Sequence, residues 1–145
     1  METGYSYLNA YDGEAFAKRG VIMVTIAYRL GIFGFMAHPD LAAEDPHHST
    51  GNYAIMDQVA ALAWIHRNIA AFGGDPENVT IFGQSAGGMS VQNLCGTPLA
   101  NGLYQHAIMQ SGGVSAKAAR WMNSRWRRRM SAAANILPTP VSIPR

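Results

Sequence analysis

Hydrophobic residues fall into runs and stripes along the chain, and these predict alternating strands and helices. Val21 to Tyr28 is a nearly continuous apolar run rich in β-branched residues, which is typical of a strand covered on both faces in a parallel sheet. From Tyr53 to Phe72, apolar residues recur every three or four positions, as they do on one face of a helix. The expected stripe consists of Ile55, Val59, Leu62, His66 and Ile69. Asn52 is the expected N-cap of this helix, and Gly73-Gly74 its end.

The second half of the pattern completes an α/β arrangement. Val79 to Phe82 indicates a second, short buried strand, and the residues after it predict a helix through about Leu94. Tyr104 to Gln110 is a third strand candidate, whereas Gly31 to Asp45 has no clean period and is expected to be a packed connection. A strand, a long helix and another strand predict a parallel crossover, so the expected fold class is α/β with about three parallel strands.

Composition places the chain among compact folded proteins. Its 145 residues suit a single domain, and 48% hydrophobic against 14% charged residues excludes a disordered chain. No apolar run reaches the length of a membrane span, and the first residues do not form a signal peptide. Cys95, the single cysteine, cannot form an internal disulfide, which favours a cytoplasmic location without excluding export.

Charge is distributed unevenly and marks a boundary. Every Asp and Glu lies at or before Glu77, whereas most Lys and Arg lie after it. We therefore expect residues 1–113 to form the ordered segment and residues 114–145 to be a basic, proline-containing tail outside it. The composition of this tail suggests a shifted reading frame or a truncated gene. The alternative is a basic arm for nucleic acid or anionic lipid, but no nucleic-acid-binding module accompanies it, so we expect no nucleic-acid partner.

Gly83-Gln84-Ser85-Ala86-Gly87 fits the G-x-S-x-G nucleophile elbow, in which a serine occupies a strained turn between a strand and a helix. Such a turn brings backbone close to the serine, so we expect Gly83 and Gly87 to be needed for their small size. The amide of Ala86 would open the helix and point at a developing oxyanion. The alternative is a glycine-rich turn with an incidental serine.

Several further segments extend this motif into a family resemblance. They are Tyr11-Asp12-Gly13, residues 24–34, Gly51-Asn52-Tyr53, Asp57-Gln58, residues 60–68, Phe72-Gly73-Gly74-Asp75-Pro76, residues 79–88 and residues 107–112. Together they resemble the type-B carboxylesterases, the cholinesterase-like branch of the α/β-hydrolases, from about Tyr11 to Gly113. The resemblance implies an α/β-hydrolase fold that is only partly present, and hydrolysis of carboxylic esters through a serine, histidine and acid triad.

Specific roles follow from the resemblance. It implies that Ser85 is the nucleophile, that Ala86 supplies one oxyanion-hole amide, and that Ser111 lies near the triad as a supporting residue. It also implies a structural pair between Arg29 and Asp57. The residues themselves agree, because each charge would be costly alone near a buried strand, although two separate solvated charges are the alternative. Neither a cofactor nor a metal is expected, and the oligomeric state is left open.

The sequence lacks recognisable partners for the serine. An α/β-hydrolase supplies its triad in the order serine, acid, histidine, yet no Asp or Glu follows Ser85 and the only later histidine is His106, in the third strand candidate. His66 is expected to be a hydrogen-bonded core residue. His38 also precedes the serine, and His47-His48 is a loop pair without metal-ligand company. The glycine-rich oxyanion loop of this class is expected before the first recognised segment.

The expected function is therefore a serine carboxylesterase acting on a small-molecule ester, present as a central segment with little or no activity of its own. Two other functional hypotheses stay open. One is a non-catalytic cholinesterase-like binding protein, which would have no need of the strained turn at Ser85. The other is a basic interaction protein that acts through its tail.

Overall fold

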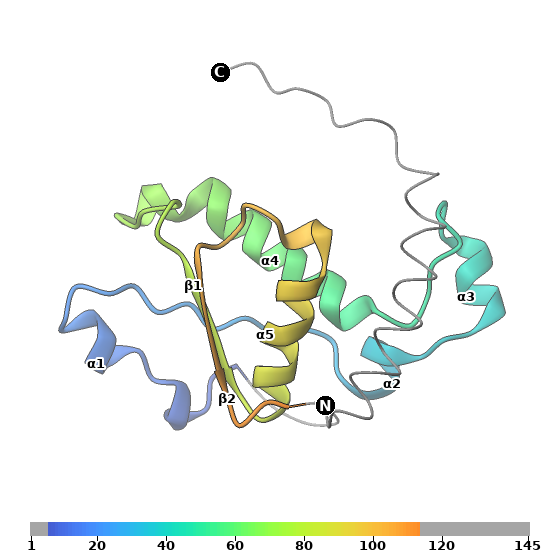
Figure 1. Ribbon diagram of the computed structural model, residues 1–145, viewed down its shortest axis with the longest axis horizontal. Helices are drawn as coiled ribbons and strands as arrows, with labels where there is room; N and C mark the ends of the chain where they lie inside the picture. The colour runs from blue at the N-terminus through green and yellow to red at the C-terminus, as the bar shows by residue number, and fades with distance from the viewer. Residues whose placement is uncertain (1–5, 114–145) are drawn as a thin grey trace, which may run out of the picture. The chain divides into compact units, whose positions relative to one another are not determined.

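A computed structural model describes residues 6–113 and places ten short elements there (Figure 1). In chain order they are η1 (Asn9–Tyr11), α1 (Glu14–Ala17), α2 (Gly31–Phe35), α3 (Pro39–Glu44), α4 (Tyr53–Asn68), η2 (Ile69–Phe72), β1 (Thr80–Gln84), α5 (Ala86–Gly96), η3 (Pro98–Ala100) and β2 (His106–Gln110). The expected basic tail, residues 114–145, lies outside the described residues. None of the described helices has the length and apolar character needed to cross a membrane.

Within residues 6–113 the sheet has two parallel strands. β1 and β2 pair in register from Thr80 with His106 to Gln84 with Gln110, and α5 connects them and packs on both (Figure 1). The parallel crossover is therefore β1, α5, β2. The crossover that we expected, with Val21 to Tyr28 as its first strand, does not form among the described residues.

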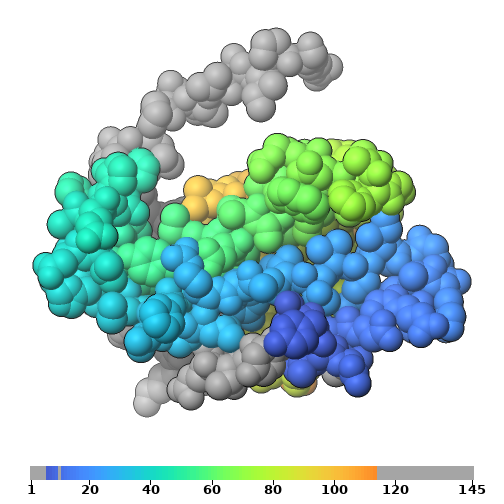
Figure 2. Space-filling view, turned by 180° about the vertical axis from the view of Figure 1, so that it is seen from behind, coloured from blue at the N-terminus to red at the C-terminus, as the bar shows by residue number. Residues whose placement is uncertain are grey.

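Val21 to Tyr28 is the main error in the expected elements. The segment runs beside α4 on the face seen in Figure 2 but pairs with no described strand, and a strand exists only through such pairing. Burial is also less than we expected. Val21, Ile22 and Val24 are exposed, and in β1 only Ile81 is buried. The connection predicted for Gly31 to Asp45 contains the two short helices α2 and α3.

The long helix was predicted correctly in its bounds but not in its buried face. α4 and η2 together span Tyr53 to Phe72, and Gly73 ends them in the left-handed conformation with φ 83°. Asn52 occupies the N-cap position, although its side chain makes no capping hydrogen bond. The buried face of the two elements consists of Ala54, Gln58, Leu62, Ile65 and Ile69. Ile55, Val59 and His66 of the expected stripe are half-buried beside it.

A hydrophobic cluster joins the long helix to the strand and helix that flank Ser85. Its members are Leu62, Ile65, Ile69, Ile81, Val91, Leu94 and Ala100. Ile81 comes from β1, and Val91 and Leu94 come from α5, so the cluster holds these two elements against α4. Burial of the apolar side chains supplies the main stabilisation, roughly 25 cal/mol per Å² of apolar surface removed from water.

Arg29 and Asp57 tie the segment before α2 to α4. Asp57 Oδ2 accepts hydrogen bonds from the Arg29 backbone N at 3.0 Å and from Nε at 2.8 Å, and Oδ1 accepts one from Nη2 at 2.6 Å. The guanidinium also lies 5.2 Å from the ring centroid of Tyr53. These hydrogen bonds lower the pKa of Asp57 below its ordinary value, against the opposing effect of partial burial.

Acidification should weaken this connection. Because the folded-state pKa of Asp57 lies below the unfolded value of 3.8, the stabilisation is complete above that pH and is lost as the pH falls through the folded-state value. We expect Asp57→Asn to lower the midpoint of thermal unfolding at pH 7, and the difference from the parent chain to shrink below about pH 4. Thermal unfolding followed by circular dichroism measures both. Glu77→Gln, which removes an exposed carboxylate before β1, is the control, and a difference that is independent of pH would contradict the expectation.

Candidate active site

Ser85 stands at the junction between β1 and α5. β1 ends at Gln84 and α5 begins at Ala86, so Ser85 is the single residue between strand and helix and occupies the N-cap position. Its backbone has φ 53° and ψ −114°, in a region that residues with a side chain seldom adopt. Conformations of this kind persist only where the surrounding structure enforces them. The order of strand, strained serine and helix is the context that a G-x-S-x-G motif requires.

The turn is close enough to exclude a side chain at Gly83. A Cβ added to Gly83 would lie 2.5 Å from both the carbonyl C and O of Gly87, closer than real atoms approach. Our reason for Gly87 needs correction, because a Cβ added there would meet no described atom within 4 Å. Gly83 is therefore restricted by the backbone of Gly87, whereas Gly87 contributes its backbone and has room for a side chain.

Pairing of the strands places a second serine beside the first. Gln84 and Gln110 are register partners at the ends of β1 and β2, and the residues that follow them are Ser85 and Ser111. The Ser85 backbone N–H donates to the Gln110 carbonyl at 2.8 Å. Ser111 also has positive φ, at 49°, and both serines are exposed. In parallel α/β sheets the carboxyl edge, where both serines lie, is the usual place for a ligand.

The helix that follows Ser85 provides a site for negative charge. The first N–H groups of a helix have no intrahelical acceptor, and the helix dipole adds partial positive charge there. Ala86 is the first residue of α5, so its N–H is one of these groups. An oxyanion formed at a carbonyl attacked by Ser85 would accept a hydrogen bond from such a donor.

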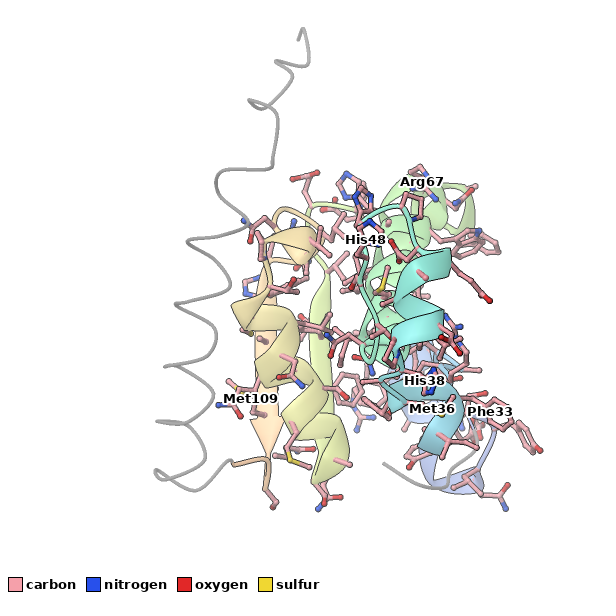
Figure 3. The ribbon with its side chains drawn as sticks, turned by 90° about the vertical axis from the view of Figure 1, so that its right-hand side faces the viewer. Phe33, Met36, His38, His48, Arg67 and Met109 are labelled. Carbon is pink, nitrogen blue, oxygen red and sulfur yellow. The ribbon has the colours of Figure 1, made fainter. Side chains whose placement is uncertain are left out.

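No described histidine makes a hydrogen bond to Ser85. His106 pairs with Thr80 at the amino end of β2, the opposite edge of the sheet from Ser85. His38 caps α3 by accepting a hydrogen bond from the Asp40 N–H, and it lies with His48 on the α3 side of the molecule, far from Met109 of β2 in Figure 3. No side chain of residues 6–113 hydrogen-bonds Ser85 Oγ.

His66 corrects another expectation. It is half-buried on α4, but its Nδ1 is enclosed and has no hydrogen-bond partner among the described groups, whereas we expected a hydrogen-bonded core histidine. Residues 6–113 also bring no group of three His, Cys, Asp or Glu side chains together as a metal site would need.

Two open hollows lie away from Ser85. Their volumes are about 590 and 430 Å³, and both are lined by Asp12, Gly13 and Met23 near α1. Neither is lined by Ser85, Ala86 or Ser111. Neither of these two hollows is therefore a candidate for a substrate site at the β1–α5 junction.

Sequence reasoning missed a buried polar contact behind the serine helix. Gln58 of α4 is only 1% exposed, and its Nε2 donates to Ser90 Oγ of α5 at 3.2 Å. Gln58 Oε1 is buried with no partner among the described groups. The periodicity of α4 placed Ile55 and Val59 on the buried face, and nothing in the sequence pairs residue 58 with residue 90.

A family model of the carboxylesterase family matches residues 1–142 of this sequence. The chain belongs to the carboxylesterase family. Among curated proteins it is 48% identical over 105 residues to the fumonisin B1 esterase of Sphingopyxis macrogoltabida, covering 72% of this chain and 19% of that protein. It is 51% identical over 115 residues to the para-nitrobenzyl esterase of Bacillus subtilis, covering 75% of this chain and 23% of that protein.

Solved structures show the same relationship. A carboxylesterase of Geobacillus stearothermophilus matches with a TM-score of 0.71 and 45% identity, over 89% of this chain and 29% of that one. These neighbours confirm the α/β-hydrolase fold class, with two parallel strands instead of the expected three in the described residues. The chain spans 19 to 29% of the length of these three relatives. The family match continues through residue 142, into the segment whose separation from the ordered domain stays a prediction.

Substitution of the two elbow glycines should have opposite effects. We expect Gly83→Ala to lower the free energy of unfolding by about 2–3 kcal/mol, because its Cβ would overlap the Gly87 carbonyl group. Gly87→Ala should be neutral or raise that free energy by up to about 1 kcal/mol, because Ala favours the helix and the space is open. Urea unfolding of the two variants measures the contrast. An equal decrease in the free energy of unfolding of both variants would contradict the expectation that only Gly83 lacks room for a side chain.

Proposed function

We propose that this chain carries the nucleophile segment of a serine carboxylesterase that acts on small-molecule carboxylic esters. The observation that carries the proposal is the backbone of Ser85, held with φ 53° between β1 and the N-terminus of α5. A serine in this turn presents its hydroxyl at the edge of the sheet, beside the free N–H groups of the helix. The membership of the chain in the carboxylesterase family supports the reaction class.

In the proposed reaction, Ser85 Oγ attacks the carbonyl carbon of the ester while a general base takes the hydroxyl proton. The carbonyl oxygen of the ester becomes an oxyanion and accepts a hydrogen bond from the Ala86 N–H. Collapse of this intermediate expels the alcohol, which receives the proton, and leaves an acyl group on Ser85. Water then attacks the acyl carbon and releases the carboxylic acid, so that the serine is restored.

The proposal divides the catalytic groups between this chain and residues outside it. Ser85 and the amide of Ala86 belong to this chain. No described histidine hydrogen-bonds Ser85, and the printed sequence has no Asp or Glu after Glu77. In this proposal the general base and its orienting acid are therefore supplied from outside the printed sequence.

A chimera tests the role of Ser85 directly. Residues 6–113 would replace the matching segment of the para-nitrobenzyl esterase of Bacillus subtilis, which then supplies the rest of a complete esterase. We expect the chimera to hydrolyse a para-nitrobenzyl ester, and Ser85→Ala in the chimera to lower kcat by about 10⁴-fold or more. Ser49→Ala, at an exposed serine between α3 and α4, is the control for a serine substitution in the same segment. A folded chimera whose activity survives Ser85→Ala would overturn the proposal.

The 145-residue chain alone should be nearly inactive. Without a base, a serine hydroxyl is a weak nucleophile, so we expect the chain to hydrolyse the same ester no faster than its Ser85→Ala variant. Release of nitrobenzyl alcohol by the purified proteins measures both rates. Hydrolysis that survives purification and disappears in the variant would show that a base is present within this chain.

A further inference from the structure

The backbone of the first turn of α5 lies close to the backbone that follows β2. Gly88 is buried, and a Cβ added to it would lie 2.8 Å from Gly112 Cα and 3.0 Å from the Gln110 carbonyl O. From the other side, a Cβ added to Gly112 would lie 2.5 Å from the carbonyl C of Gly88 and 2.9 Å from the Met89 N. Neither position has room for a side chain, so α5 packs directly against the residues that follow β2.

The path of the chain after β2 creates this contact. Gln110 accepts the hydrogen bond from the Ser85 N–H, Ser111 turns the backbone with φ 49°, and Gly112 then meets Gly88. The serine turn is thus fixed at two points from β2, one at Ser85 and one a turn further along the helix. Contact of Gly83 with Gly87 fixes it from β1. Gly112 belongs to neither the elbow motif nor the helix, yet its contact with Gly88 restricts where both can lie.

We propose that Gly112 and Gly88 are positioning residues for the nucleophile turn. Their contact sets the height of the first turn of α5 above the end of β2, and thereby the place of the Ala86 N–H relative to Ser85. The proposal rests on the proposed function, in which that amide stabilises an oxyanion. Fixed donors of this kind work because they need no rearrangement when charge develops on the substrate.

The distances show how far the turn would have to move. A Cβ at Gly112 would approach the Gly88 carbonyl C to 2.5 Å, whereas ordinary contact begins at 3.4 Å. Both partners are backbone, so neither can rotate aside as the end of a side chain can. The first turn of α5 would be displaced by roughly an ångström, an amount that can cost about 10²-fold in rate when it misplaces a catalytic group.

Amide signals in the nuclear magnetic resonance spectrum of the full chain test this directly. We expect Gly112→Ala to shift the signals of Ser85 and Ala86, which are distant in sequence, while that of Val59 in α4 stays unchanged. Gly113→Ala is the matched control, because a Cβ there would meet no described atom within 4 Å. A purely structural role would lower stability without moving the Ser85 and Ala86 signals of the folded chain. Unchanged signals in folded Gly112→Ala, or equal shifts in Gly113→Ala, would overturn the proposal.

A second variant tests the same contact by a substitution in α5. Gly88→Ala gains helix propensity, which partly offsets the overlap and favours a folded variant. We expect it to shift the signals of Ser111 and Gly112 and to speed amide exchange over residues 85–89 by about tenfold. Exchange and shifts equal to those of the parent chain would contradict the proposal. Neither readout depends on catalysis, so the positioning role can fail while the chimera experiment succeeds, or the reverse.

Discussion

The approach of the Gly83 position to the backbone of Gly87 is the constraint on which the site depends. A chain that passes from strand to helix in one residue must bring the two backbones together, and a side chain at Gly83 would keep them apart. The cost appears at Ser85, whose backbone takes a conformation that only surrounding contacts can maintain. That one turn determines the positions of the serine hydroxyl and of the first amides of α5.

The rest of the described structure supports this turn from a distance. Ile81 in β1 and Val91 in α5 join the cluster built on α4, so strand and helix are both anchored within a few residues of Ser85. Gln58 adds a buried hydrogen bond between α4 and α5. Arg29 and Asp57 hold the chain before α2 to the same long helix. α4 thus connects the segments that the sequence separates, and the exposed β2 contributes through its backbone.

Local patterns predicted the features that depend on neighbouring residues. The bounds of α4, its end at Gly73 and the strand, serine and helix order follow from periodicity and from glycine placement. Contacts between distant residues were beyond such patterns. Gln58 is polar and yet the most buried large side chain of residues 6–113, and its hydrogen-bond partner lies in α5. Val21 to Tyr28 has the composition of a strand, but a strand needs a hydrogen-bonded neighbour, which composition cannot supply. The meeting of Gly88 and Gly112 likewise depends on how α5 crosses β2.

The backbone torsion of Ser85 is the measurement that tests this account most directly. Three-bond couplings and amide chemical shifts of the labelled 145-residue chain report φ at that residue in solution. The account predicts a positive φ near 53°, with Ala86 as the first residue of a regular helix. A negative φ at Ser85 in the folded chain would contradict it, because the serine would then lie in an ordinary turn without the close approach of Gly83 and Gly87.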